Sequence, residues 1–180
     1  METIRVSRCA FVVIKLKLLC TPYFLMRRDP RWKDVNFIGG HATEADKGHF
    51  LRTARRELLE EVPAFRRFKS FDLTPLTANV TYGPLFSKSA HQQVQYSVRF
   101  YLLRFAESPQ PLVKGLLQQT RTPNLFVKES DLFDGWRHQI SGFAKVLTDT
   151  LGHDAQSIPY SWTDNIELKP TSIDQPSLTF

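Results

Sequence analysis

The stretch Gly39–Pro63, GGHATEADKGHFLRTARRELLEEVP, decides the fold of this chain. Its two glycines directly follow the short apolar segment Val35–Ile38, which predicts a strand that runs into a flexible loop. From about His49 to Val62 the pattern becomes that of an amphipathic helix, which Pro63 ends. The apolar residues that predict the helix recur at spacings of three and four and are Leu51, Ala54, Leu58 and Val62.

The predicted helix contains the string Arg56-Glu57-Leu58-Leu59-Glu60-Glu61. Glu57 lies one helical turn from both Glu60 and Glu61, so the three carboxylates gather on one flank of the helix. Like charges at this spacing repel one another unless a cation neutralises them, and Mg²⁺ prefers hard oxygen ligands that leave room for phosphate. The alternative interpretation is a solvated helix face, on which neighbouring arginines form ion pairs with the glutamates.

The stretch Gly40–Ala64 resembles the Nudix box of the Nudix hydrolases, commonly written G-x5-E-x7-R-E-U-x-E-E-x-G-U with U an apolar residue. Gly40 matches the opening glycine, Arg56-Glu57-Leu58 matches R-E-U, and Glu60-Glu61 matches the paired glutamates. The match therefore covers the opening glycine and the R-E-U and E-E positions of the box.

The sequence departs from the box at three places. Asp46 stands where the first glutamate is expected, with Glu44 as a competing candidate, and nine residues rather than seven separate Asp46 from Arg56. Pro63 replaces the closing glycine. The additional residues fall in the loop before the helix, where changes of length are tolerated, and proline also ends a helix. The carboxylates of the box are therefore retained.

The resemblance implies an α/β fold, a Nudix-like α/β/α sandwich with a mixed β-sheet, over residues 1–152. It also implies a pyrophosphohydrolase that cleaves a nucleoside diphosphate linked to another moiety, such as a nucleotide sugar, a dinucleoside polyphosphate or an NTP. Mg²⁺, or alternatively Mn²⁺, is the implied cofactor. The expected partner is a phosphorylated nucleotide small molecule.

By the same resemblance, Glu57, Glu60 and Glu61 are the expected metal ligands. Arg56 is expected to pair with a box carboxylate, with Glu60 at i,i+4 the nearest choice. The general base is either Glu57 or a glutamate from a distant loop, for which Glu129 is the candidate.

The substrate-binding residues expected around the box come from several segments. Gly39 and Gly40 allow close backbone approach, and His41 contacts either a phosphate or the loop itself. Trp32 either stacks on a base or sugar or is a buried aromatic. Further candidates are Arg27 and Arg28, which end a strand near the box and either grip a phosphate or cover a sheet edge. Tyr82 is another, because it lies near where the dinucleoside-polyphosphate subgroup carries a tyrosine.

The remaining elements are predicted from apolar and β-branched patterning. A single helix is expected from Ser130 or Asp131 to Gly152, carrying Leu132, Trp136, Ile140, Phe143 and Leu147. Residues 153–180 are expected to form an arm or a partly disordered tail, whose first part Tyr160 and Trp162 anchor. The predicted strands are Cys9–Leu19, Pro22–Arg28, Phe71–Phe86, Val94–Ala106 and a short Leu125–Val127; Ser87–Gln93 forms a hairpin, and Ser108–Pro123 a loop with or without a short helix.

Composition narrows the classes of function. The 180 residues carry 24 Lys and Arg against 18 Asp and Glu, a formal charge of +6, which favours either an anionic ligand or simply solubility. Cys9 and Cys20 form no metal or disulfide pattern, and the apolar run between them is interrupted by lysines, so we expect a cytoplasmic protein without a membrane segment.

Alternatives remain open at this level. One is a nucleotide-metabolite sensor that keeps the fold without catalysis, and another is an RNA-end pyrophosphohydrolase. Because the sequence contains no RNA-binding aromatic motif or dense basic tract, a small molecule is preferred over nucleic acid. A homodimer is compatible with the sequence.

Overall fold

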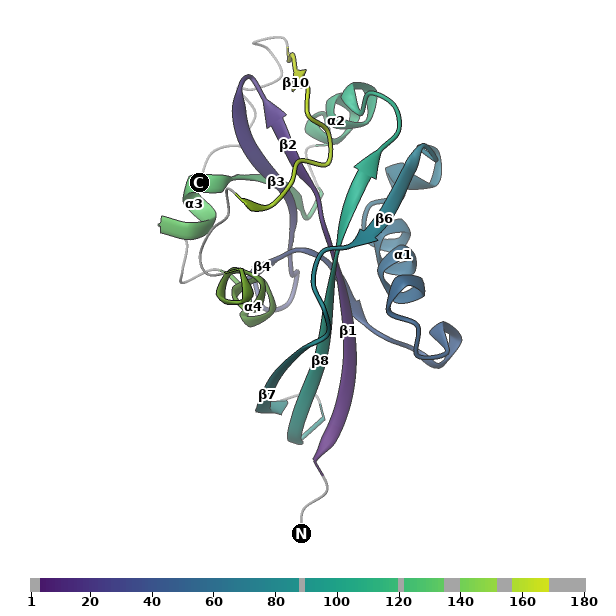
Figure 1. Cartoon of the computed structure of the whole chain (residues 1–180), viewed down its shortest axis with the longest axis vertical. Coiled ribbons are helices and arrows are strands. Elements are labelled where there is room, and N and C mark those ends of the chain that lie inside the picture. The colour runs from purple at the N-terminus through teal and green to yellow at the C-terminus, as the bar shows by residue number, and fades with distance from the viewer. Residues whose placement is uncertain (1–3, 88–89, 120–121, 135–139, 152–156, 169–180) are drawn as a thin grey trace.

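Two β-sheets form the centre of the computed structural model, which describes residues 4–87, 90–119, 122–134, 140–151 and 157–168 (Figure 1). The first sheet has the order β5-β1-β8-β6, with β7 also paired to β8; the second has the order β10-β2-β3-β4, with β9 paired to β3. Both sheets are mixed, because β1 runs parallel to β8 and β10 parallel to β2 among antiparallel pairs. The strands are β1 (Arg5–Val13), β2 (Lys15–Leu18), β3 (Thr21–Arg28), β4 (Val35–Asn36), β5 (Ile38–His41), β6 (Phe71–Pro75), β7 (Val80–Ser87), β8 (Gln92–Phe105), β9 (Asn124–Lys128) and β10 (Asn165–Ile166).

The helices cover both sides of these sheets. Their bounds are α1 (Phe50–Glu61), α2 (Gln110–Leu117), α3 (Glu129–Asp134) and α4 (Gly142–Thr150), with 3₁₀ turns η1 (Glu44–Asp46) and η2 (Pro63–Arg66) on either side of α1. Figure 1 shows α1 and α4 on opposite sides of the long β1–β8 pair. Within the described residues, none of these helices has the length and apolar character needed to cross a membrane.

Strand β1 separates the two halves of the core. Ala10 and Val12 are fully buried in the cluster that contains α1, whereas Phe11 and Val13 are buried in the cluster that contains α4. Successive side chains of a strand point to opposite faces, so a strand covered by helices on both faces is apolar throughout. The predicted α/β/α sandwich is therefore confirmed.

The glycine pair lies in a strand, so the prediction of a flexible loop there is wrong. Gly39 and Gly40 belong to β5 and pair with Phe11 and Ala10 of β1. A Cβ on Gly39 would lie 2.3 Å from the carbonyl oxygen of Ala10. Because only glycine permits such a close approach, the glycines allow β5 to pair tightly with β1 and lie against α1.

Helix α1 confirms the predicted span, but its buried stripe differs by one residue. Ala54 and Leu58 are buried as expected, whereas Leu51 is 48% exposed and Thr53 is buried in its place. The Thr53 hydroxyl is buried because it donates a hydrogen bond to Asp46, 3.1 Å away. Apolar periodicity alone could not show this polar contact.

The predicted strand Phe71–Phe86 is divided into β6 and β7, so that prediction is wrong in part. Both strands pair with the long strand β8, and the amide nitrogens of Leu76 and Thr77 between them bond to the carbonyl oxygen of Phe100. The chain therefore shifts between two registers along one partner. The hairpin is confirmed, because Ser87 pairs with Gln92.

The predicted C-terminal helix is wrong as a single element, since α3 and α4 replace it and Trp136 lies outside the described residues. Ile140 forms a parallel bridge to Val35, and the amide of Ser141 donates to the carbonyl of Val35 at 2.9 Å. Ile140 is therefore paired to β4 and not part of a helix, and the Ser141 hydroxyl caps α4.

Residues 157–168 pack against the second sheet. Strand β10 pairs with β2, Ile158 is buried, and Trp162 packs on the core as expected for an anchor. The ring of Tyr160 lies 4.7 Å from the Lys15 ammonium. This part of the predicted arm therefore belongs to the folded body.

Candidate functional site

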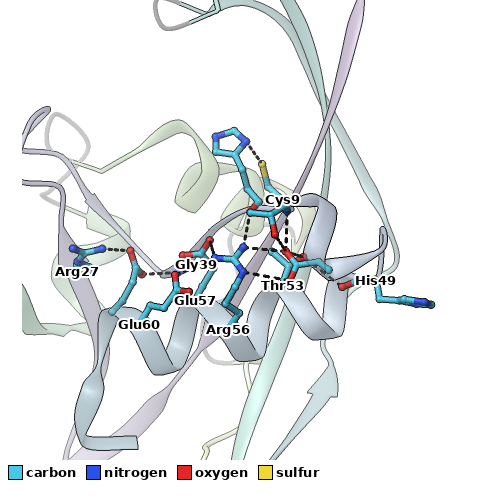
Figure 2. A network of polar contacts seen from close by, with 12 residues as sticks. Cys9, Arg27, Gly39, His49, Thr53, Arg56, Glu57 and Glu60 are labelled. Carbon is cyan, nitrogen blue, oxygen red and sulfur yellow. Dashed lines mark hydrogen bonds and ion pairs between the residues drawn. The ribbon is translucent and has the colours of Figure 1, made fainter. Parts of the chain in front are cut away.

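Arg56 is the centre of the polar network on α1 (Figure 2). Its guanidinium donates to the His41 carbonyl at 2.8 Å and to the Asp46 carboxylate at 3.0 Å. It also lies 2.8 Å from an oxygen of Glu57 and 3.1 Å from an oxygen of Glu60. The expected Arg56–Glu60 pair is present, and the same side chain ties α1 to β5 and to the loop that precedes the helix.

Asp46 is buried and takes hydrogen bonds from three neighbours. The backbone amide of Thr43 donates to it at 2.8 Å, the Thr53 hydroxyl at 3.1 Å, and Arg56 through two nitrogens. Hydrogen bonding from Arg56 is the main reason why the pKa of Asp46 falls from 3.8 to about 2. Glu44 is exposed, so Asp46 is the acidic residue that meets the box arginine.

Replacement of Asp46 by asparagine (D46N) is expected to remove an acid-sensitive part of the stability. Because the folded-state pKa lies below the unfolded value, the ion pair stabilises fully above pH 4 and is lost as the pH falls from about 4 towards about 2. The lowered pKa corresponds to about 2 kcal/mol by linkage. Urea unfolding at pH 7, 4 and 2.5 measures the free energy of unfolding of D46N and of the parent protein, with E44Q as the control at an exposed carboxylate. Equal pH dependence in D46N and the parent protein would contradict this assignment.

Glu61 joins α1 to β3 and β5. One oxygen of its carboxylate pairs with Arg27 of β3, and the other accepts from the amide nitrogen of Gly39 at 2.9 Å. Burial raises the pKa of Glu61, although the Gly39 hydrogen bond and the Arg27 charge oppose this rise. Glu61 is thus held on the side of α1 that faces the glycine strand.

Glu57 lies against Gly40. A Cβ on Gly40 would approach an oxygen of Glu57 to 2.8 Å, so the missing side chain leaves space for this carboxylate. Burial is also the main cause of the raised pKa of Glu57, and the charge of Arg56 opposes it. Glu57 and Glu61 are each 14% exposed and Glu60 is 53% exposed. Two carboxylates on this flank of the helix are therefore mostly buried and the third is exposed.

A cavity of about 260 Å³ opens beside Glu61 and the glycine strand. It brings Gly39, Gly40 and His41 together with Arg27 and Glu61, and its remaining lining is aromatic or polar. The Nδ1 atom of His41 lies 2.9 Å from the Ser7 hydroxyl and 3.3 Å from the Cys9 thiol, and desolvation lowers the pKa of His41. The other lining residues are Phe11, Asp29, Trp32, Asp34, Asn36, Phe37, Ser141 and Phe143.

The oxygen donors of α1 fit a hard divalent cation in chemistry. Glu57, Glu60 and Glu61 supply carboxylates on one flank, and Gly40 leaves room beside one of them. Among the described residues, however, no three His, Cys, Asp or Glu side chains converge to hold a metal as they stand. Arg27 and Arg56 form ion pairs with these carboxylates, so a bound cation would share or replace these contacts.

No protein-family model and no curated sequence matches this chain. Several solved structures match this chain. The chain is similar to a C. elegans Ap4A hydrolase with a TM-score of 0.51 and 16% identity, over 82% of this chain and 98% of that one. It is similar to RenU, a Nudix hydrolase from M. smegmatis, with a TM-score of 0.51 and 12% identity, over 84% and 88%.

A third solved structure is the Nudix domain of Shewanella oneidensis NrtR in complex with ADP ribose, with a TM-score of 0.50 and 10% identity, over 85% of this chain and 89% of that one. These neighbours share one architecture. The chain has the Nudix fold. The identities are low, so the similarity concerns the fold alone.

Three predicted site residues lie away from the glutamates of the Nudix box. Glu129 lies 2.5 Å from the buried ammonium of Lys15, and its neighbour Lys128 pairs with Tyr23, about 13 Å along β3 from Arg27. The structure therefore does not bring Glu129 to α1. The other two are Arg28 and Tyr82, neither of which lines the cavity.

Strand geometry explains why Arg27, rather than Arg28, meets the Nudix box. Leu25 of β3 packs in the cluster on the α1 side and Met26 in the cluster on the α4 side. Arg27 therefore points towards α1 and Arg28 away from it. The sequence signal for this difference is the alternation of side chains along β3. It assigns Arg27 to the α1 side only once the position of α1 is known.

Tyr82 belongs to an aromatic group behind the cavity. Its ring lies 5.6 Å from that of Phe143 and 6.3 Å from that of Tyr96. Because Phe143 itself lines the cavity, Tyr82 supports the wall instead of forming it.

Proposed function

We propose that this protein is a metal-dependent pyrophosphohydrolase acting on nucleotide derivatives. The observation that carries the proposal is the flank of α1, where Glu57, Glu60 and Glu61 lie beside the Gly39–Gly40 strand and a cavity. The Nudix fold supports it, because the neighbours include an Ap4A hydrolase and a domain bound to ADP ribose.

In this proposal the residues of α1 have separate roles in metal binding, orientation and proton transfer. Glu60 and Glu61 would hold Mg²⁺ or Mn²⁺, and the ion when bound screens phosphate charge and lowers the pKa of a bound water. Arg56 orients Glu60, and the Gly39 amide orients Glu61. Glu57 takes the role of general base, since burial raises its pKa towards the working pH and Glu129 lies elsewhere.

Removal of metal is expected to abolish turnover. A panel of ADP-ribose, dinucleoside polyphosphates, nucleotide sugars, NTPs and capped RNA is incubated with Mg²⁺ or Mn²⁺, and products are separated by chromatography. We expect cleavage at a pyrophosphate bond of at least one small nucleotide, loss of activity with EDTA, and recovery with excess Mg²⁺. Turnover that persists unchanged in EDTA would contradict metal dependence.

A second candidate is a sensor of nucleotide metabolites on the same fold. The observation that favours it is the pairing of the glutamates with Arg27 and Arg56, which leaves the carboxylates neutralised without a metal. A sensor would bind one member of the panel tightly with no turnover in either metal. Cleavage of any nucleotide in the panel with a kcat above about 0.1 s⁻¹ would exclude the sensor. This threshold lies below the range of typical enzymes.

A further inference from the structure

Trp32 forms one wall of the cavity from the loop between β3 and β4. Its side chain is 53% exposed although it lines a concave site. The loop is held by Asp29, whose carboxylate accepts from the amides of Arg31 and Trp32 at 2.7 Å each. The amide of Asp29 in turn donates to the Asp34 carbonyl at 2.8 Å. An exposed indole on a closed turn is a preorganised stacking surface.

The indole borders both the cavity and a cation. The Arg31 guanidinium lies 4.7 Å from the ring of Trp32, and Arg31 does not line the cavity. Stacking between an arginine and a base on the two faces of one indole is compatible with the preference of aromatic rings for cations and π-systems.

The polar groups next to Trp32 are carboxylates, whereas Arg27, paired with Glu61, lies beside α1. Asp29 and Asp34 line the Trp32 end, where two carboxylates disfavour phosphate. Arg27 and the glycine strand lie at the other end. The cavity therefore favours a ligand with an uncharged, aromatic portion at Trp32 and an anionic portion near Arg27.

Strand pairing fixes the order of these groups along the cavity. Asn36 pairs with Arg27 across β4 and β3, so their side chains are neighbours. Asp34 lies two residues before Asn36, just outside β4, and also lines the cavity. Its carbonyl accepts from the Asp29 amide, so Asp34 lies further along this pairing from Arg27. The side-chain oxygen Oδ1 of Asn36 accepts from the backbone amide of Phe37 at 2.9 Å, which leaves the side-chain nitrogen of Asn36 to donate. Burial and the neighbouring charge of Asp29 raise the pKa of Asp34, and its carboxylate when ionised only accepts hydrogen bonds.

We propose that Trp32 stacks on the nucleobase of the substrate and that Asp34 accepts a hydrogen bond from an exocyclic amino group of that base. The phosphates then extend past Asn36 to Arg27 and the glycine strand. This inference rests on the proposed function for the identity of the ligand as a nucleotide. It selects amino-bearing bases, such as adenine, over bases that lack the amino group.

Binding of ADP and of inorganic imidodiphosphate tests the stacking role without turnover. In W32A the Kd of ADP is expected to rise about tenfold, the size of one lost base–aromatic contact, whereas the Kd of imidodiphosphate stays unchanged. ADP should quench tryptophan fluorescence in the parent protein and in W162F, but not in W32F. Trp162 is the matched control because it packs on the core.

The amino-group contact is tested by comparing ADP with inosine diphosphate, whose base lacks the amino group. The parent protein should bind ADP about tenfold more tightly, and D34N should lose most of this preference. Equal affinities in the parent protein overturn the Asp34 contact. An ADP affinity unchanged in W32A, or no ADP binding at millimolar concentration, overturns the base site.

These outcomes separate the two proposals. Tryptophan-dependent ADP binding without hydrolysis of any nucleotide would remove the proposed enzymatic function and keep the base site. Hydrolysis that is equally efficient in W32A and the parent protein, with equal ADP affinity, would keep the enzyme and remove the base site.

Discussion

Replacement of Glu61 by glutamine (E61Q) is expected to lower kcat by about 10³-fold, which is about 4 kcal/mol of transition-state stabilisation. Glutamine keeps an oxygen that accepts from the Gly39 amide, so the strand–helix contact survives. What it loses is the negative charge that would hold a divalent cation beside the cavity. Arg27 also loses its carboxylate partner, which places an uncompensated positive charge there.

Three measurements make the E61Q result specific. Circular dichroism and the thermal midpoint should show a folded protein, and the Mg²⁺ concentration for half-maximal activity should rise. E44Q is the matched control, since Glu44 is an exposed glutamate of the loop that precedes α1, where Asp46 instead meets Arg56, and E44Q should retain full activity. A folded E61Q protein with parental kcat would remove Glu61 from the catalytic machinery.

The local part of the site could be predicted from the sequence because helical geometry depends on short spacings. The string from Arg56 to Glu61 is enough to place three carboxylates on one flank of α1, and the structure shows that arrangement. The Arg56–Glu60 contact at i,i+4 follows from the same geometry. No knowledge of the remaining chain was needed for these features.

The long-range part could not be predicted, because it depends on which strand faces which helix. Arg27 meets Glu61 across 34 positions of sequence, and only the pairing of β3 selects it over Arg28. Likewise, the pairing of Lys15 with Glu129 is visible only after β9 and the segment around Tyr160 have packed on the second sheet. The sequence gives no indication of this partner for Glu129, which is therefore paired with Lys15 and does not reach α1.

The glycine pair also combines a local sequence feature with a long-range contact, and the contact can be tested. Replacement of Gly39 by alanine (G39A) is expected to destabilise the protein by about 3 kcal/mol or more, because overpacking and backbone strain add. Its Cβ would lie 2.3 Å from the Ala10 carbonyl oxygen and 2.7 Å from the Phe11 Cα. Both are backbone atoms of β1, which is buried on both faces and cannot move aside.

Two matched glycine substitutions sharpen this prediction, measured by urea unfolding and by activity. G115A, in α2 with nothing within 4 Å of the added methyl group, should stabilise by about 0.5–1 kcal/mol through helix propensity. G40A meets only the carboxylate of Glu57, a flexible side-chain end, so it should cost less stability than G39A and act mainly on turnover. If G39A were as stable as G115A, the close pairing of β5 with β1 would be wrong, and with it the anchoring of Glu61 by the Gly39 amide.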